Sequence, residues 1–510
     1  MSFEPKDFYL GDTWQCSDGE NVHCFYLQNR EHDSRTDLIG GSIGHAVSKD
    51  MMHWTELPPA LYRDGGSEDQ ELDLWTGCTV IDNGIWYLFY TSRRRSNVLA
   101  NSICVATSTD GITWEKYEGN PVIEPDGRYY YNMENDVKLA VHSNNEEAYK
   151  LVDCRDLCVV WDEEQQVWWG YFAVRRPGDE CTETSVIGLA RSEDLLHWEQ
   201  LPPCFCPNKY GCIETPEVFC INGKWYMLCL SGNDYGQRNR TGDPNMIGRI
   251  TVYAVADKPE GPYHECFEDS VILGSMEASG ICSRTVLHND KRYFFYSQTL
   301  TYADPSKRAL LTLSLPKEVL QNEDGSLSLG WYEGIDTLCR ENGVLLSKEH
   351  VLVDNGRWGS RCKWSYNEDT ICVEPKHDWC VQMFDVEGGN YVLETTIKRG
   401  DCIAAGFIFD VVGNDIYSSN RVAMIDFEEE EVWLTQARNF KKVNARKTKL
   451  QGDTYHFKLL CLGDTIEIYV NEELKVHHQC ERTGGKIGLL ADMGKVQFKE
   501  TKIRFIDETL

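Results

Sequence analysis

The chain lacks long hydrophobic runs and any excess of basic charge. No stretch of its 510 residues approaches the roughly 18 apolar residues that cross a bilayer as a helix. Residues 1–7 contain no basic region followed by an apolar stretch, so we expect no secretory signal. Lys and Arg number 51 against 81 Asp and Glu, a formal net charge of −30. This charge repels phosphate backbones and anionic lipids, so we expect no nucleic-acid partner and no membrane partner, whereas a neutral sugar meets no such penalty.

Cysteine is plentiful, but its placement indicates free thiols. The 21 cysteines are an odd number and are scattered through predicted strands, as at Cys78, Cys104, Cys229 and Cys372. In a reducing compartment such residues act as small buried hydrophobes, so we expect a cytoplasmic location. A further group lacks the spacing of two C-x-x-C pairs, so we expect no metal site there: Cys204, Cys206, Cys212 and Cys220.

Two repeated elements run through the first two thirds of the chain. The unit Ala-x-Ser-x-Asp-x-x-x-Trp, which reads as an outer hairpin, occurs three times and is followed by a degraded copy, at Ala46–Trp54, Ala106–Trp114, Ala190–Trp198 and Ala254–Tyr263. A β-rich aromatic run occurs five times, at Val22–Gln28, Ile85–Thr91, Val167–Val174, Lys224–Leu230 and Arg292–Gln298. Such repetition marks an array of supersecondary units, and five interleaved runs predict five four-stranded blades of a β-propeller.

The repeat also predicts the domains of an all-β protein. The propeller is expected over residues 1–330, because the repeats stop there, and residues 331–343 are interpreted as a linker. From 344 to 510 short alternating strands resume without the Trp unit, which is typical of an antiparallel β-sandwich. Helical periodicity is nearly absent, and Lys317–Gln321 is the best short candidate for a helix.

Three acids stand where the inner strands of the propeller are expected to begin. Each inner strand should start about ten residues before its aromatic run, and Asp12, Asp156 and Glu214 lie at such starts. Inner strands surround one channel, so these acids are expected to point together at one end of it. Breaking a glycosidic bond requires an acid to protonate the departing oxygen and a carboxylate to attack the anomeric carbon or activate water. The pattern therefore predicts glycoside chemistry.

Several stretches resemble the family 32 glycoside hydrolases, the invertase, inulinase and levanase group. Cys154-Arg155-Asp156-Leu157 resembles the family's Arg-Asp-Pro motif, and the segment from Ile213 to Phe219 resembles its Glu-Cys-Pro-Asp-Leu-Phe motif. The segment from Ile43 to Trp54 is similar to the signature Trp-Gly-His-Ala…Ser-x-Asp…His-Trp. The resemblance implies a five-bladed propeller followed by a C-terminal β-sandwich.

The resemblance also implies a role for each acid. Asp12 would be the nucleophile, although Gly11-Asp12-Thr13 departs from the family's Asn-Asp-Pro; Asp18 competes with it but reads more like a hairpin turn. Glu214 would be the acid/base, and Asp156 would stabilise the transition state. The implied reaction is retaining cleavage of β-fructofuranosides without metal or organic cofactor, and a sugar acceptor would give transfructosylation.

Five further residues are predicted to bind the sugar. Trp14 and Trp75 lie at inner-strand starts, where an indole stacks well on the apolar face of a furanose ring. Trp75-Thr76-Gly77 stands in the place of the family's Phe-Ser-Gly, and Arg155 precedes one of the acids. Gln28 is either a substrate ligand or a satisfied core amide.

Two other functions remain open at this point. A family 43-like propeller would invert, with Asp12 activating water to cleave arabinofuranosides or xylosides. Alternatively, the propeller would bind sugars without catalysing any reaction, and would share only its fold with these enzymes. In each case the expected partner is a small carbohydrate, and the chain is expected to be a monomer or a small homo-oligomer.

Overall fold

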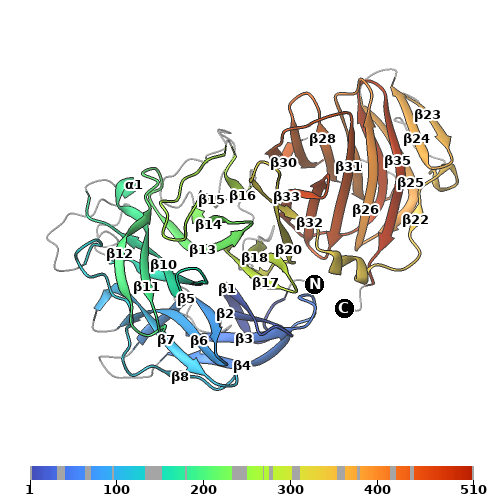
Figure 1. Ribbon diagram of the computed structural model, residues 1–510. Coiled ribbons are helices and arrows are strands. Elements are labelled where there is room, and N and C mark those ends of the chain that lie inside the picture. The colour runs from blue at the N-terminus through green and yellow to red at the C-terminus, as the bar shows by residue number, and fades with distance from the viewer. Residues whose placement is uncertain are drawn as a thin grey trace.

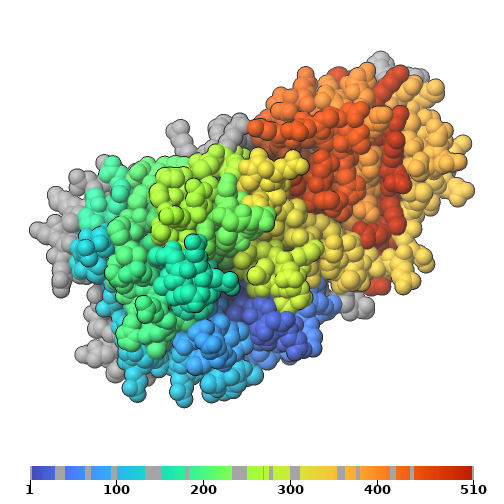
Figure 2. Space-filling view, in the orientation of Figure 1, coloured from blue at the N-terminus to red at the C-terminus, as the bar shows by residue number. Residues whose placement is uncertain are grey.

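The computed structural model consists of two β-rich lobes (Figures 1 and 2). It describes residues 3–30, 41–63, 71–94, 97–132, 152–178, 181–231, 250–267, 269–274, 280–300, 310–352, 362–375, 379–413, 421–436 and 441–507. None of the helices in these ranges has the length and apolar character needed to span a membrane.

The first lobe is a β-propeller in which each blade has four main strands. The strands, blade by blade, are β1 (Phe8–Ser17), β2 (Val22–Arg30), β3 (Ser42–Ser48) and β4 (Thr55–Tyr62); β5 (Glu71–Asp82), β6 (Ile85–Arg94), β7 (Asn97–Ser108) and β8 (Glu115–Lys116); β9 (Cys154–Asp162), β10 (Val167–Arg175), β11 (Ser185–Ser192) and β12 (Glu199–Phe205); β13 (Ile213–Ile221), β14 (Lys224–Ser231), β15 (Ile250–Ala256) and β16 (Val271–Leu273); and β17 (Ile281–His288), β18 (Lys291–Leu300), β20 (Lys317–Gln321) and β21 (Leu327–Gly330). The short β19 (Leu310–Leu313) pairs with β18, and α1 (Cys181–Thr184) precedes β11.

The first strands of the five blades form a closed ring. β1 contacts β5, β5 contacts β9, β9 contacts β13, β13 contacts β17, and β17 returns to β1. The five aromatic runs lie in the second strands, β2, β6, β10, β14 and β18, as the repeat predicts. Residues near the start of each inner strand therefore surround one channel.

The Ser/Asp unit forms the predicted turn between the third and fourth strands. In the second blade Ser108 Oγ donates to Asp110 Oδ1 over 2.9 Å, and the same oxygen accepts the N–H groups of Ile112 and Thr113. The Thr113 and Ile112 N–H groups hold the pKa of Asp110 at about 2. The copies around Asp50 and Asp194 make equivalent bonds, so the motif is a self-capping turn.

The prediction of a helix at Lys317–Gln321 is wrong. The segment is strand β20, which pairs with β18 on one side and with β21 on the other. Five residues are too few to support an isolated helix, and completing the sheet of the fifth blade provides backbone partners on both sides.

The second lobe is a sandwich of two antiparallel sheets. One sheet contains β22 (Val344–Leu345), β23 (Cys362–Asn367), β24 (Thr370–Pro375), β26 (Tyr391–Arg399), β31 (Thr454–Leu462), β32 (Thr465–Val470), β33 (Glu473–Gln479) and β35 (Val496–Phe505). The other contains β25 (Trp379–Gly388), β27 (Ala404–Val411), β28 (Arg421–Asp426), β29 (Glu431–Gln436), β30 (Lys441–Lys447) and β34 (Gly485–Asp492). Alternate side chains of both sheets form one buried apolar cluster.

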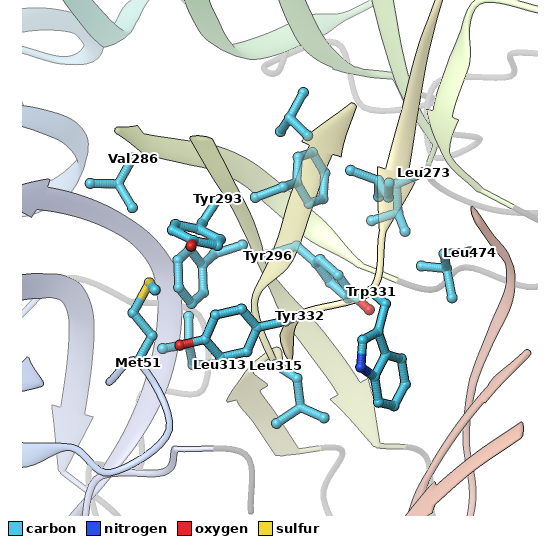
Figure 3. Close-up of a cluster of buried hydrophobic side chains, with 14 of the residues drawn as sticks. Met51, Leu273, Val286, Tyr293, Tyr296, Leu313, Leu315, Trp331, Tyr332 and Leu474 are labelled. Carbon is cyan, nitrogen blue, oxygen red and sulfur yellow. The ribbon is translucent and has the colours of Figure 1, made fainter. Parts of the chain in front are cut away.

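The two lobes share backbone pairing and an apolar interface. Gly330 at the end of β21 pairs with Glu473 of β33, so the sheet of the fifth blade continues into the sandwich. The segment after β21 begins with Trp331 and Tyr332 and includes the 3₁₀ turn η3 (Glu333–Leu338); a second turn, η4 (Lys348–His350), follows β22. Trp331 and Tyr332 lie among blade-five side chains and Leu474 in a common cluster (Figure 3).

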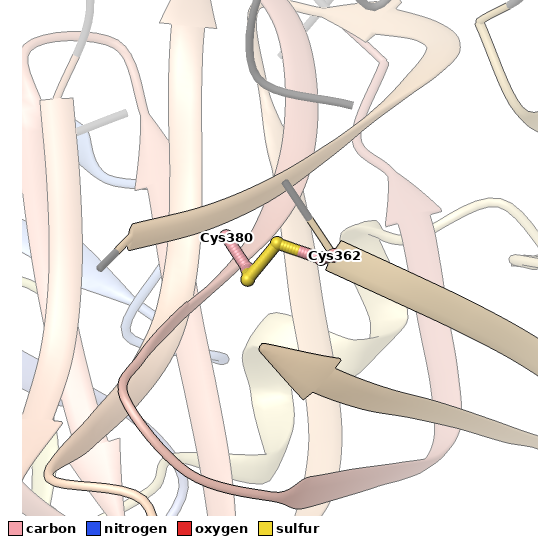
Figure 4. The surroundings of a disulfide bond; sticks show 2 residues. All are labelled: Cys362 and Cys380. Carbon is pink, nitrogen blue, oxygen red and sulfur yellow. A yellow bond between two sulfur atoms is a disulfide. The ribbon is translucent and has the colours of Figure 1, made fainter. Parts of the chain in front are cut away.

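One pair of cysteines departs from the expectation of free thiols. Cys362 of β23 and Cys380 of β25 form a disulfide, with Cα atoms 5.9 Å apart (Figure 4). The expectation is wrong for this pair because strands from the two sheets bring them together, which their separation in sequence does not reveal. Cys78, Cys229 and Cys372 carry free thiols.

Candidate active site

Every inner strand of the propeller contains a bulge in the same part of the strand. The pairing register shifts between Leu10 and Thr13 in β1 and between Trp75 and Gly77 in β5; the bulged residues of the other three inner strands are Asp156-Leu157, Thr215-Pro216 and Cys282-Ser283. Bulges re-aim side chains and are common beside active sites. Asp12 and Asp156 lie within bulges, and Glu214 immediately precedes one.

Three threonines connect the bulges of neighbouring blades. Thr76 Oγ1 donates to Asp12 Oδ2. Thr91 Oγ1 donates to the Thr76 carbonyl over 2.9 Å and accepts the N–H of Asp156 over 3.0 Å. The N–H of Thr215 donates to Asp156 Oδ2 over 3.0 Å. The carboxylates of Asp12 and Asp156 are thus held by one hydrogen-bonded chain that crosses four blades.

Arg155 joins the second and third predicted acids. Its Nη2 lies 3.1 Å from Glu214 Oε2, and its Nε lies 3.4 Å from Asp156 Oδ2. Nη1 binds Asp153 Oδ1 at 2.5 Å, and Nη2 also donates to Cys212 Sγ. Burial opposes the charged guanidinium, but Asp153 and its other neighbours keep the pKa of Arg155 well above its ordinary value. Arg155 is therefore a buried cation that orients the acids.

The three predicted acids differ in exposure and share one electrostatic environment. The Glu214 side chain is 28% exposed, whereas Asp156 as a whole is 3% exposed. Burial raises the pKa of Asp156 to about 7; the charges of Glu214 and Asp12 add to the rise, and Arg155 opposes it. The three acids are therefore close enough to influence one another electrostatically, and Glu214 is the one that solvent reaches.

Asp18, the other candidate for the nucleophile, lies in the turn between β1 and β2. Its Oδ1 accepts the N–H groups of Glu20 and Asn21 at 2.8 and 2.6 Å, and its Oδ2 lies 3.2 Å from His23 Nε2. These bonds hold the pKa of Asp18 well below its ordinary value even though partial burial raises it. The Asp18 carboxylate is engaged in the turn, whereas Asp12 lies in the hydrogen-bonded chain that includes Asp156.

Two of the predicted sugar ligands lie in the core. Trp14 is 1% exposed, stacks on Phe25 and donates from Nε1 to Thr79 Oγ1 over 3.1 Å. Gln28 is buried and donates to Ser42 Oγ over 3.1 Å. Both side chains pack within the first two blades, so the structure offers neither surface to a ligand.

Trp75 differs from these two residues because it is not in the core. Its side chain is half-buried, and the Arg93 guanidinium carbon lies 5.1 Å from the ring centroid. Arg93 is itself held by Asp73, to which Nε donates over 2.9 Å. Trp75 directly precedes Thr76, the residue that binds Asp12, in the chain.

Several residues of the site carry no signal in the sequence. Thr215 acts through its backbone N–H, a group that most residues possess, and Thr91 acts through a hydroxyl inside an aromatic run. Arg284 lies shortly before the aromatic run Arg292–Gln298, but the spacing rule was applied to acids alone. Glu217 lies within the motif around Glu214, but only the fold shows that its Oε1 accepts the N–H and hydroxyl of Thr285. The described residues contain no cluster of His, Cys, Asp and Glu arranged to hold a metal ion.

A separate groove of about 810 Å³ lies between the fourth and fifth blades and the sandwich. Its lining combines aromatic, acidic and basic side chains, among them Tyr253, Phe267, Asp324, Arg446 and Lys475. None of the predicted acids lines it, so the groove is distinct from the candidate active site.

Comparison with known proteins gives the same fold and a family. The family described as "Glycosyl hydrolases family 32 N-terminal domain" matches residues 3–341. The exo-inulinase of Aspergillus awamori has a TM-score of 0.70 at 16% identity, covering 100% of this chain and 98% of that one. The Bombyx mori GH32 beta-fructofuranosidase BmSUC1 has a TM-score of 0.68 at 16% identity, with 99% and 93% covered. At such identities the likeness shows the shared fold.

Similarity in sequence is confined to part of each relative. The levanbiose-producing levanase of Bacillus subtilis is 25% identical over 240 residues, which is 42% of this chain and 37% of the levanase. The sucrose-6-phosphate hydrolase of Escherichia coli is 28% identical over 235 residues, 43% of this chain and 42% of that protein. Fructan 1-exohydrolase w3 of Triticum aestivum is 27% identical over 325 residues, 62% and 47% of the two chains. The chain thus spans less than half the length of these relatives.

Proposed function

The chain belongs to the family 32 glycosyl hydrolases, and on this basis we propose that it cleaves β-fructofuranosides by a retaining double displacement. The observation that carries the proposal is the hydrogen-bonded chain from Asp12 through Thr76 and Thr91 to Asp156, with Glu214 held beside it by Arg155. Relatives are named for levan, fructan and sucrose-6-phosphate, so fructosides are the substrates to assay first.

In the first step Asp12 attacks the anomeric carbon of the fructosyl ring while Glu214 protonates the departing oxygen. The Thr76 hydroxyl orients the Asp12 carboxylate, which is only partly buried. The half-buried indole of Trp75 provides the adjacent apolar surface for the ring.

In the second step Glu214 accepts a proton from water, and the resulting nucleophile releases fructose from Asp12 with its original anomeric configuration. A sugar hydroxyl in place of water gives transfructosylation. Asp156 acts in both steps, because its negative charge stabilises the positive charge that develops on the ring. This role requires Asp156 to be ionised, although burial holds its pKa near 7.

The test is a release assay on sucrose, inulin, levan and an aryl arabinofuranoside, with the first-formed anomer identified by NMR. We expect fructose with retained configuration from at least one fructoside. Glu214→Gln should lower kcat/KM by about 10² to 10⁴-fold, the usual contribution of a general acid. Inverted product, or sugar binding without turnover of any furanoside, would contradict the proposal.

A trapping experiment separates Asp12 from Asp18. Glu214→Gln incubated with an activated aryl fructoside should accumulate the covalent intermediate, visible by mass spectrometry as one added fructosyl unit that fragmentation of the peptide assigns to Asp12. Asp18→Asn is the matched control, because among the described residues its carboxylate binds turn groups and His23. That variant should keep wild-type turnover; loss of turnover there, together with activity in Asp12→Asn, would reverse the assignment.

A further inference from the structure

The fifth blade contributes a buried arginine where other blades contribute acids. Arg284 of β17 directly follows the bulge at Cys282 and Ser283 and is 1% exposed. Its Nη1 donates to the carbonyl of Pro216, and its Nη2 donates to the carbonyl of Gly77 over 3.4 Å. One guanidinium therefore reaches the second and fourth blades across the channel.

The two carbonyls belong to the bulges that hold the catalytic carboxylates. Gly77 follows Thr76, whose hydroxyl binds Asp12. Pro216 follows Thr215, whose N–H binds Asp156 and whose backbone has a φ of +50°. Such a left-handed conformation is unfavourable for a β-branched residue and persists only where surrounding contacts hold it.

Arg284 is itself fixed by a buried partner. Glu217 Oε2 lies 3.5 Å from Arg284 Nη1, while Glu217 Oε1 accepts the N–H and the hydroxyl of Thr285 over 3.0 and 2.6 Å. Cys158 Sγ donates to the same Oε2 over 3.7 Å. The carboxylate is thus anchored on the strand that carries the arginine, which limits the orientations open to the guanidinium.

We propose that Arg284 is a positioning residue: from across the propeller channel it fixes the bulges of β5 and β13, whose Thr76 and Thr215 bind the carboxylates of Asp12 and Asp156. The inference rests on the proposed function, for which these two carboxylates must keep a set geometry around one ring. A planar fork that binds two carbonyls and a carboxylate cannot be replaced by the single ammonium group of lysine.

The positive charge of Arg284 has a second effect, on the pKa of Asp156, which can be tested separately from the positioning of the bulges. The groups that act on Asp156 are Arg155, Glu214, Asp12 and Arg284, and those that act on Arg284 are Glu217, Asp156, Cys158 and Cys282. The Arg284 charge lowers the pKa of Asp156 against the rise caused by burial. Removing that charge should therefore raise the pKa of Asp156, whereas Arg284→Lys retains the charge and changes only the geometry.

Two variants separate geometry from charge. Arg284→Lys should lower kcat about 10²-fold with KM changed less than about threefold, because small displacements of reacting groups have effects of this size. The acidic limb of its kcat/KM profile should stay where it is in the wild type. Arg284→Met/Glu217→Gln removes both buried charges together, and it should lower kcat similarly while moving the acidic limb to higher pH.

The matched control is Arg482→Lys in the sandwich. Arg482 is also a buried fork, with bonds to Asp410 and to the carbonyls of Gly389 and Gly463. This variant should lose stability without a change in kcat or in the pH profile. Wild-type kcat in both folded Arg284 variants, or an equal loss in Arg482→Lys, would overturn the inference.

A substrate-free measurement keeps the inference distinct from the proposed function. Hydrogen exchange followed by mass spectrometry should show faster exchange in peptides that contain Thr215 in Arg284→Lys, relative to wild type and to Arg482→Lys. Unchanged exchange there would refute the positioning role even if the wild-type enzyme cleaved no fructoside. Faster exchange with an inactive wild type would instead contradict only the assigned reaction.

Discussion

Asp156 combines three features that oppose stability. It is buried, it lies between two other acids, and its backbone φ of +60° is in the left-handed region. Each such feature carries a free-energy cost of the order of 1–3 kcal/mol that surrounding contacts must offset. Thr91 and Thr215 supply these contacts through hydrogen bonds to its N–H and to its Oδ2.

Asp156→Asn should raise stability at neutral to alkaline pH. The pKa of Asp156 is about 7 in the folded chain, above the ordinary 3.8. A raised pKa gives stability that is fully present below the unfolded pKa and is lost as pH rises through the folded one. The gain of the variant over wild type should thus grow by about 2–4 kcal/mol between pH 4 and pH 8. Urea unfolding at both pH values measures it; a gain independent of pH would contradict the pKa assignment.

Trp14 and Trp75 should respond differently to truncation. Trp14→Ala removes a core indole and should lower the free energy of unfolding by about 3–5 kcal/mol. Trp75→Ala removes a half-buried ring beside Thr76 and should raise KM several-fold with little change in stability. Kinetics on sucrose together with urea unfolding measure both effects. A wild-type KM for Trp75→Ala would exclude its indole from the sugar site.

At the scale of elements, the sequence predicts what repeats and misses what depends on pairing. The Ser/Asp turns and aromatic runs were predictable because each copy carries the same residue types. The bulges were not, since Asp12, Thr76, Asp156, Thr215 and Cys282 have little in common; only the register between strands reveals them. Lys317–Gln321 was misread for the same reason, because its strand character comes from neighbours in the sheet.

The residues of the candidate site fall into the same two groups: those at positions that repeat in the sequence, and those whose role depends on pairing between strands. The spacing before the aromatic runs found Asp12, Asp156 and Glu214, because inner strands recur at regular positions. It could not separate Trp14 from Trp75, since the bulge in each strand decides which side chains face the core. Arg284 reaches its partners through a fork that spans three blades, a relation absent from any local pattern.

The disulfide should act as a staple between the two sheets of the sandwich. Cys362 and Cys380 are 18 residues apart and join β23 to β25. Closing a loop of this length stabilises by roughly 3 kcal/mol through the unfolded state. Cys362→Ser/Cys380→Ser should lose about that amount in urea unfolding of the oxidised protein. Cys372→Ala, on the neighbouring β24, is the control.

Thiol titration of the denatured chain checks the bond itself. Reduction before titration should reveal two more thiols than the unreduced sample. Equal values would show that both cysteines are free in solution, as the sequence interpretation expected for all of them.

At the scale of the molecule, the lobes are joined by an ion pair that is closed to water. Lys317 of the fifth blade and Glu467 of the sandwich are both buried, with Nζ 2.8 Å from Oε1. Tyr469 donates to Glu467 Oε2 over 2.6 Å, and His477 Nδ1 lies 3.4 Å from Oε1. Burial alone would raise the pKa of Glu467, but Lys317 and His477 hold it at about 2.

Removing one member of the pair should lower stability more than replacing both members with uncharged residues. Lys317→Met leaves the Glu467 charge buried and unpaired, which should lower stability by about 3–5 kcal/mol at pH 7. Lys317→Met/Glu467→Gln should recover most of this, because glutamine still accepts the Tyr469 hydroxyl and no charge remains. Urea unfolding followed by tryptophan fluorescence measures both. The control is Lys291→Met, whose ion pair with Glu318 on the same blade is 42% exposed at the lysine and should change stability by about 1 kcal/mol or less.

The pH dependence of stability in Lys317→Met tests whether the unpaired Glu467 charge causes the loss. A depressed carboxyl pKa contributes stability above the unfolded value, ordinarily 4.5, that is lost as pH falls through the folded value of about 2. In Lys317→Met the desolvated Glu467 should instead take up a proton at higher pH, so this variant should approach the wild type in stability as pH falls from 7 to 4. A deficit that stays constant over this range would contradict the assignment of the lost stability to an unpaired Glu467 charge, and would assign it instead to the lost contacts of the lysine side chain.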